Sequence, residues 1–100
     1  MLRHYVTIKY IVDTPPEHIA VFCEKMRALQ DIIPEVAFLE IGRDELKTER
    51  SWSLILIMKF DTTAALKNYQ QHPQHQAVMS FNGPYVADVG SIDFTDYQSH

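Results

Sequence analysis

The residue types that could do chemistry gather between Tyr69 and His75, where the chain reads Tyr69-Gln-Gln-His72-Pro73-Gln-His75. Proline cannot continue a helix that precedes it but suits the first turn of a new one. The helix that carries Tyr69 is therefore predicted to end near His72, with a short helix beginning there. His75 then lies in a first helical turn, where the positive end of the helix macrodipole disfavours imidazolium. A neutral His75 could act as a general base.

The same residues also allow a structural interpretation. His72 would then only cap the new helix, and His75 would be a half-buried polar residue. A zinc site built from His72 and His75 would need a third ligand, and none follows at a suitable spacing. No metal site and no cofactor are predicted.

The first strand, residues 2–10, places a third histidine among apolar residues. His4, Val6, Ile8 and Tyr10 alternate onto one face, which the pattern reserves for the core. A lone histidine on such a face is usually a hydrogen-bonded core residue, and His4 is also a candidate for catalysis.

A long amphipathic helix follows. Thr14-Pro15-Pro16-Glu17 has the spacing of a capping box, with proline at the first helical position, and Pro34 ends the helix. The apolar stripe consists of Ile19, Phe22, Met26, Leu29 and Ile33. His18 lies off this stripe and is predicted to face solvent, whereas Cys23 is predicted to lie in or near the core.

Two strands are predicted next, over residues 36–43 and 52–60, joined by a polar loop. In the second of them Leu54, Leu56, Met58 and Phe60 face one way, and Ile55 and Ile57 face the other. Helices can cover only one face of the sheet, so a second copy of the chain is predicted to cover the other. The sequence thus predicts a homodimer.

A helix over residues 64–71, the short helix to about Phe81, a turn at Asn82-Gly83-Pro84, a strand over 86–94 and a polar tail over 95–100 complete the chain. The order β-α-β-β-α-β predicts an α+β, ferredoxin-like fold with an antiparallel four-stranded sheet. Residues 1–100 are expected to form one domain.

Composition excludes several classes of function. With 13 acidic and 9 basic residues the formal charge is -4, and the basic residues form no patch, so nucleic acid is not an expected partner. The apolar run at 54–58 is too short to cross a membrane, and no secretory signal pattern is present. A cytoplasmic location is the default expectation. The single cysteine, Cys23, rules out an intramolecular disulfide.

Several short motifs resemble the stress-responsive A/B barrel (Dabb) family. These are His4-Tyr-Val-Thr-Ile-Lys9-Tyr10, Ile32-Ile33-Pro34, Gly42-Arg43, Tyr69-x-x-His72-Pro73-x-His75 and Asp93-Phe94. The resemblance implies a homodimer whose two sheets pack as a dimeric α+β barrel, with a small cavity in each subunit between the sheet and its own helices.

The resemblance also implies candidate roles. In one branch of the family, a plant polyketide cyclase, a histidine acts as the base for an aldol-type ring closure and a tyrosine assists. By motif these fall on His75 and Tyr69, and the cyclase's first-strand histidine falls on His4. Its pocket aromatics on the first helix fall on Cys23 and Met26, so the substrate does not carry over.

Three functions remain open from the sequence. In the first, the chain is a homodimeric family member of undetermined activity, serving stress protection or assembly. In the second, it is a lyase- or cyclase-like enzyme in which His75 abstracts a proton next to a carbonyl, and Tyr69 or His4 stabilises the oxyanion. In the third, by fold analogy, it is a cofactor-independent monooxygenase or isomerase.

The enzyme hypothesis requires a mostly apolar cavity for a small carbonyl or aromatic ligand. Its expected lining is Val6, Ile8, Phe22, Met26, Leu29, Leu39, Leu56 and Val78.

Overall fold

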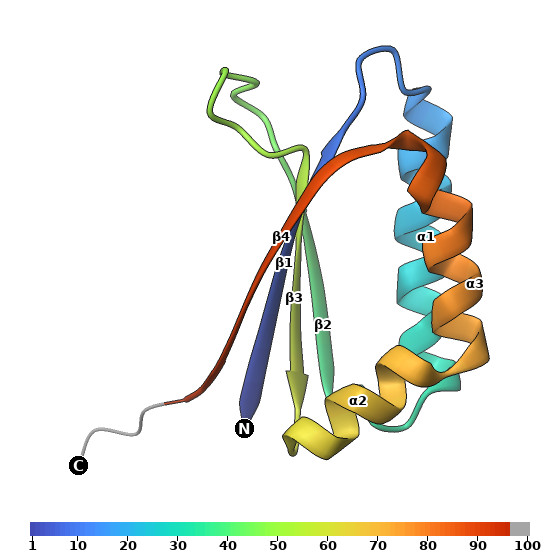
Figure 1. Cartoon of the computed structure of the whole chain (residues 1–100), viewed down its shortest axis with the longest axis vertical. Coiled ribbons are helices and arrows are strands. Elements are labelled where there is room, and N and C mark those ends of the chain that lie inside the picture. Colours follow the sequence, from blue (N-terminus) through green and yellow to red (C-terminus); the bar gives the residue numbers. More distant parts are fainter. Residues whose placement is uncertain (97–100) are drawn as a thin grey trace.

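The computed structural model describes residues 1–96, which form one four-stranded sheet with the helices on one of its faces (Figure 1). The elements are β1 (Leu2–Tyr10), α1 (Pro16–Ile32), β2 (Phe38–Arg43), β3 (Leu54–Phe60), α2 (Thr63–Gln71), α3 (Pro73–Asn82), the 3-10 turn η1 (Gly83–Tyr85) and β4 (Val86–Thr95). The order β-α-β-β-α-α-β confirms the predicted ferredoxin-like plan, with the second helical region split by Pro73. Residues 97–100 of the predicted tail lie outside the described residues.

All neighbouring strands run antiparallel, in the order β2-β3-β1-β4. The central strand β3 alternates strictly between buried and half-buried residues, because one side of it packs under the helices. The neighbouring strand β1 follows the same alternation except at Val6, which lines a pocket and is only half-buried. On β3 Leu54, Leu56, Met58 and Phe60 are buried, while Ile55 and Ile57 are only half-buried on the opposite face. The prediction of two apolar faces is confirmed.

The first helix begins differently from the prediction. Pro15 is the N-cap residue and Pro16 the first helical residue, and no side chain caps the helix. The Thr14 hydroxyl donates to the carbonyl oxygen of Ile11 instead, at 2.7 Å. The predicted capping box is therefore wrong, because the fixed backbone angle of proline starts the helix one residue later than the Thr-x-x-Glu spacing requires.

Two strands are shorter than predicted. β2 begins at Phe38 rather than at Val36, because Val36 closes a turn on the carbonyl of Ile33. β3 begins at Leu54 rather than at Trp52. The core fills the space between the sheet and α1, and Phe22, Met26 and Phe60 are completely inaccessible to solvent there.

Candidate functional site

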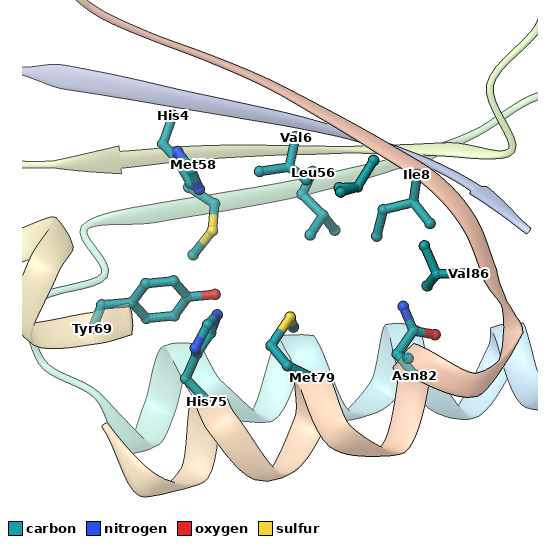
Figure 2. Close-up of a pocket in the computed structure, with 12 residues that line it drawn as sticks. His4, Val6, Ile8, Leu56, Met58, Tyr69, His75, Met79, Asn82 and Val86 are labelled. Atoms are coloured by element: carbon teal, nitrogen blue, oxygen red, sulfur yellow. The ribbon is translucent and has the colours of Figure 1, made fainter. Parts of the chain in front are cut away.

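A pocket of about 370 Å³ lies between the sheet and α3 (Figure 2). Four polar side chains reach it, from β1, α2 and α3: His4, Tyr69, His75 and Asn82. The rest of the lining is mostly apolar: Val6, Ile8, Leu56, Met58, Met79, Gly83, Val86 and Val89. Such a space suits a small, mostly apolar molecule that is oriented by a few polar groups.

His75 projects into the pocket from the first turn of α3 (Figure 2). His72 is the N-cap, and its side chain accepts from the backbone N–H of Gln74 at 3.1 Å. The predicted break at Pro73 is confirmed, with one helix ending at Gln71 and the next beginning at Pro73.

The hydrogen bond made by His75 defines which of its nitrogens is free. Its Nδ1 lies 3.1 Å from the carbonyl oxygen of Gln70, so Nδ1 carries the proton and donates. The carbonyl belongs to the last turn of α2, where carbonyl groups lack partners within the helix. Nε2 therefore retains its lone pair, as a general base requires.

Burial lowers the pKa of His75 from its ordinary value of 6.5, and the nearby His4 and His72 lower it further. The Gln70 carbonyl acts in the opposite direction but does not reverse the shift. The prediction that His75 is neutral at pH 7 agrees with this direction, although burial is the main cause.

Tyr69 lies beside His75, with the ring centroids 4.4 Å apart and the planes inclined by 57°. Its ring is buried against Phe60, while its hydroxyl points into the pocket (Figure 2). Burial raises the pKa of the Tyr69 hydroxyl well above its usual value, so the group keeps its proton and can donate a hydrogen bond.

His4 approaches from the sheet side and is 6% exposed. Its direct cross-strand partner on β4 is Asp93, and the Nδ1 atom of His4 bonds the Asp93 carboxylate. This contact fixes the imidazole at the same end of the pocket as Tyr69 and His75. We call this the His75 end.

Asn82 lies at the other end of the pocket, at the C-terminus of α3. The predicted turn at Asn82-Gly83-Pro84 is the end of α3 followed by η1. Asn82 Oδ1 accepts from the hydroxyl of Tyr10 at 2.7 Å and lies 3.0 Å from Nε2 of His18. We call this the Asn82 end.

The prediction that His18 faces solvent is wrong. Its side chain is 9% exposed, stacks on Phe81 at a centroid distance of 4.6 Å and packs against Tyr85 at 4.2 Å. The end of α3 and η1 cover the first turn of α1. The apolar stripe of α1 does not predict this contact, because His18 lies off the stripe.

The structure brings together only part of the predicted pocket lining. Val6, Ile8 and Leu56 face the pocket. The other five predicted residues do not line it: Phe22, Met26, Leu29, Leu39 and Val78. The first three fill the core on the inner side of α1, Leu39 lies on the far edge strand β2, and Val78 lies with Leu29 in a hollow between α1 and α3.

Sequence reasoning missed several residues of the site. Met58 lies two residues after Leu56 on the same face of β3, and Met79 lies one helical turn beyond His75, so periodicity could have found both. Val86, Val89 and the partnership of Asp93 with His4 depend on how β4 pairs with β1. Nothing in the sequence shows that Asn82 is buried.

Within residues 1–96, no three His, Cys, Asp or Glu side chains are arranged to hold a metal ion. No helix in that part of the chain is both long and apolar enough to cross a membrane.

Comparison with known proteins gives a family and a fold. The model of the Stress responsive A/B Barrel Domain matches residues 2–96. Among curated proteins, no sequence matches the chain significantly.

Solved structures with the same fold include proteins from bacteria and a plant. A dimeric ferredoxin-like protein of unknown function from Thermobifida fusca is 22% identical, with a TM-score of 0.83 over 93% of this chain and 88% of its own. A Dabb family protein from Mesorhizobium loti is 21% identical, with a TM-score of 0.80 over 97% of each chain. The hydroxynitrile lyase from Passiflora edulis is 16% identical, with a TM-score of 0.87 over 99% of this chain and 95% of its own. At these identities the likeness concerns the fold.

Proposed function

This chain belongs to the stress responsive A/B barrel domain family, and from that premise we propose that it binds a small carbonyl compound and abstracts a proton next to the carbonyl, with His75 as the base. One observation carries the proposal. A pocket of about 370 Å³ with a mostly apolar lining reaches both His75 and Tyr69. A family member whose role was only structural would have no need of space around these two groups.

The reaction uses groups already in place. Nε2 of His75 takes a proton from the carbon next to the carbonyl, and the electron pair of that C–H bond forms a C=C bond. The carbonyl oxygen becomes an enolate oxygen, which accepts a hydrogen bond from the Tyr69 hydroxyl, while His4 lies at the same end of the pocket. The protonated His75 then returns its proton to the enolate carbon, or that carbon attacks a second carbonyl in an aldol-type ring closure and the resulting alkoxide takes the proton from His75. No cofactor is needed for these steps.

The environment supports these roles. His75 has a lowered pKa and an Nδ1 bonded to the Gln70 carbonyl, so the lone pair on Nε2 is available near pH 7. Tyr69 has a raised pKa and keeps its proton for donation. One protein with this fold is named a hydroxynitrile lyase, which supports a lyase-like activity without indicating the same substrate.

The functional unit we propose is a homodimer. The sheet face opposite the helices carries half-buried Ile55 and Ile57 together with exposed Phe38, Ile92 and Phe94, which are 38%, 61% and 40% exposed. A second copy packed on this face would remove these side chains from water. Dimeric ferredoxin-like proteins among the structural neighbours support the same arrangement.

The proposal is tested by a thermal-shift screen of aromatic and β-keto compounds, followed by measurement of α-proton exchange in D₂O by NMR for each compound that binds. We expect His75→Ala to slow exchange by about 10²- to 10⁴-fold, because it removes the base. Tyr69→Phe removes one hydroxyl and should slow exchange while keeping the fold.

His72→Ala is the matched control, because it removes a neighbouring imidazole that does not line the pocket. It should lower stability by about 1 kcal/mol through the lost N-cap. Exchange should change far less than in His75→Ala, because His72 makes the smallest contribution to the lowered pKa of His75. If no compound stabilises the wild type while His75→Ala lowers the melting temperature, His75 is structural and the proposal fails.

A further inference from the structure

The Asn82 end of the pocket offers polar groups of its own, apart from His75 and Tyr69 at the other end. Asn82 is 2% exposed, yet its amide is only partly bonded. Its Oδ1 atom lies 2.7 Å from the Tyr10 hydroxyl and 3.0 Å from Nε2 of His18. Within residues 1–96 the side-chain hydrogen bonds of Asn82 both go to Oδ1, and Nδ2 is not among the fully buried polar atoms that lack a partner, so it is open to the pocket.

Tyr10 determines which way the amide faces. Burial raises the pKa of Tyr10 to about 12, so its hydroxyl keeps its proton. In the part of the chain that the structure describes, that proton has one acceptor, Oδ1 of Asn82. Nε2 of His18, as a donor, adds a second hydrogen bond to the same oxygen. Figure 2 shows the amide nitrogen pointing from α3 toward the sheet, below Ile8 and Val86.

An amide nitrogen whose N–H groups open into a mostly apolar pocket favours a ligand that brings an acceptor, because a ligand that displaces water from these groups without replacing its hydrogen bonds loses affinity. We infer that the ligand of this pocket carries a second hydrogen-bond acceptor, such as a carbonyl, hydroxyl or ether oxygen, and that Asn82 Nδ2 binds it. This inference rests on the proposed function, since it assigns the opposite end of the same ligand. Tyr10 and His18 act as positioning residues that hold the amide.

The helix geometry sets the spacing of the two acceptors. His75 and Asn82 lie on the same face of α3, and seven residues at 1.5 Å per residue separate them by about 10 Å along the axis. The first oxygen accepts from Tyr69, which lies beside His75, and the second accepts from Asn82 Nδ2. Allowing about 3 Å for each hydrogen bond, the two oxygens lie about 4 Å apart if both bonds point along the axis and about 10 Å apart if both are perpendicular to it. The part of the ligand between its two oxygens is apolar, because it lies against Leu56, Met79 and the other apolar residues of the pocket. The substrate class is therefore a ketone with a second oxygen several bonds away.

The test compares matched probes: 2,6-heptanedione, 2,7-octanedione and 2,8-nonanedione, each with the isostere in which one C=O is replaced by C=CH₂. Dissociation constants come from NMR shift titration. For wild type we expect at least one dione to bind about tenfold more tightly than its isostere, because the isostere leaves the Asn82 donor unpaired. Equal dissociation constants for the dione and its isostere in every pair would overturn this inference and leave the proposed function standing.

Three variants separate the roles. Asn82→Asp still accepts from Tyr10 and His18 but presents an acceptor to the ligand, so the dione's advantage should disappear or reverse. Tyr10→Phe frees the Asn82 amide to rotate and should reduce the dione's advantage over its isostere. If Tyr10 were only structural, this ratio of dissociation constants would not change. His75→Ala should weaken both probes of a pair alike and leave their ratio intact.

Two further results would count against the inference. An unchanged ratio in folded Asn82→Asp would show that Asn82 does not bind the second oxygen. Failure of every probe to bind wild type at millimolar concentration would overturn both this inference and the proposed function.

Discussion

Tyr69 and His75 pack with their ring centroids 4.4 Å apart although they belong to different helices. On one continuous helix, six residues at 100° per residue would place them about 120° apart around the axis. The break at Pro73 redirects the chain, so that both side chains reach the same pocket. The proline thereby brings a potential base and a potential hydrogen-bond donor to the same side of one cavity.

The pKa of His75 should lie below 6.5 in an NMR titration of the imidazole, because burial disfavours its charged form. Between the folded pKa and 6.5 the unfolded chain binds more protons than the folded one, so the free energy of unfolding falls as the pH falls through this range. Above 6.5 this contribution does not change with pH.

Urea unfolding of wild type at pH 7.5 and 5.5 checks this dependence on pH. In His75→Gln the loss of stability between the two pH values should be smaller. A titration midpoint at or above 6.5 would contradict the proposed electrostatic environment.

Asp93→Ala should lower the free energy of unfolding by about 1–3 kcal/mol, because it leaves the buried Nδ1–H of His4 without its partner. Chemical denaturation measures the loss. Asp88→Ala is the matched control on the same strand, since Asp88 is exposed, and it should change stability by less than about 0.5 kcal/mol. Equal losses in the two variants would mean that the His4–Asp93 contact adds nothing.

His18→Ala should cost about 1–3 kcal/mol, because it removes the stacking on Phe81 and the hydrogen bond to Asn82. Thermal and urea unfolding measure the change. Glu17→Ala alters the exposed neighbour in the same helical turn and should cost less than about 1 kcal/mol. A similar small effect for both variants would show that His18 does not stabilise the end of α3.

Light scattering should show a dimer at about ten micromolar and above. The interface is expected to bury roughly 800 Å² per subunit or more. Ile92→Lys places a charge on the sheet face opposite the helices and should dissociate the dimer, because the lysine would be desolvated without a partner. Val12→Lys is the control, since Val12 is 86% exposed and follows β1 in a loop. A wild-type monomer at this concentration would rule out the homodimer.

Local patterns in the sequence determined the elements and some of the site. Period-two alternation placed β1 and β3 and turned His4 inward, and the two apolar faces of β3 were apparent from the same alternation. Pro73 located the helix break and put His75 in a first turn. These features depend on residues close together in the chain, so they can be derived without knowing the fold.

The tertiary structure decided how these elements meet. Asp93 faces His4 because β4 pairs with β1 in one register, and a slip of one residue would turn Asp93 to the other face. His18 is buried because the end of α3 covers the start of α1, and Asn82 becomes polar lining of the pocket through the same packing. The predicted pocket residues on α1 belong to the core instead. Register and helix placement arise from contacts between residues far apart in sequence, and local periodicity carries no information about them.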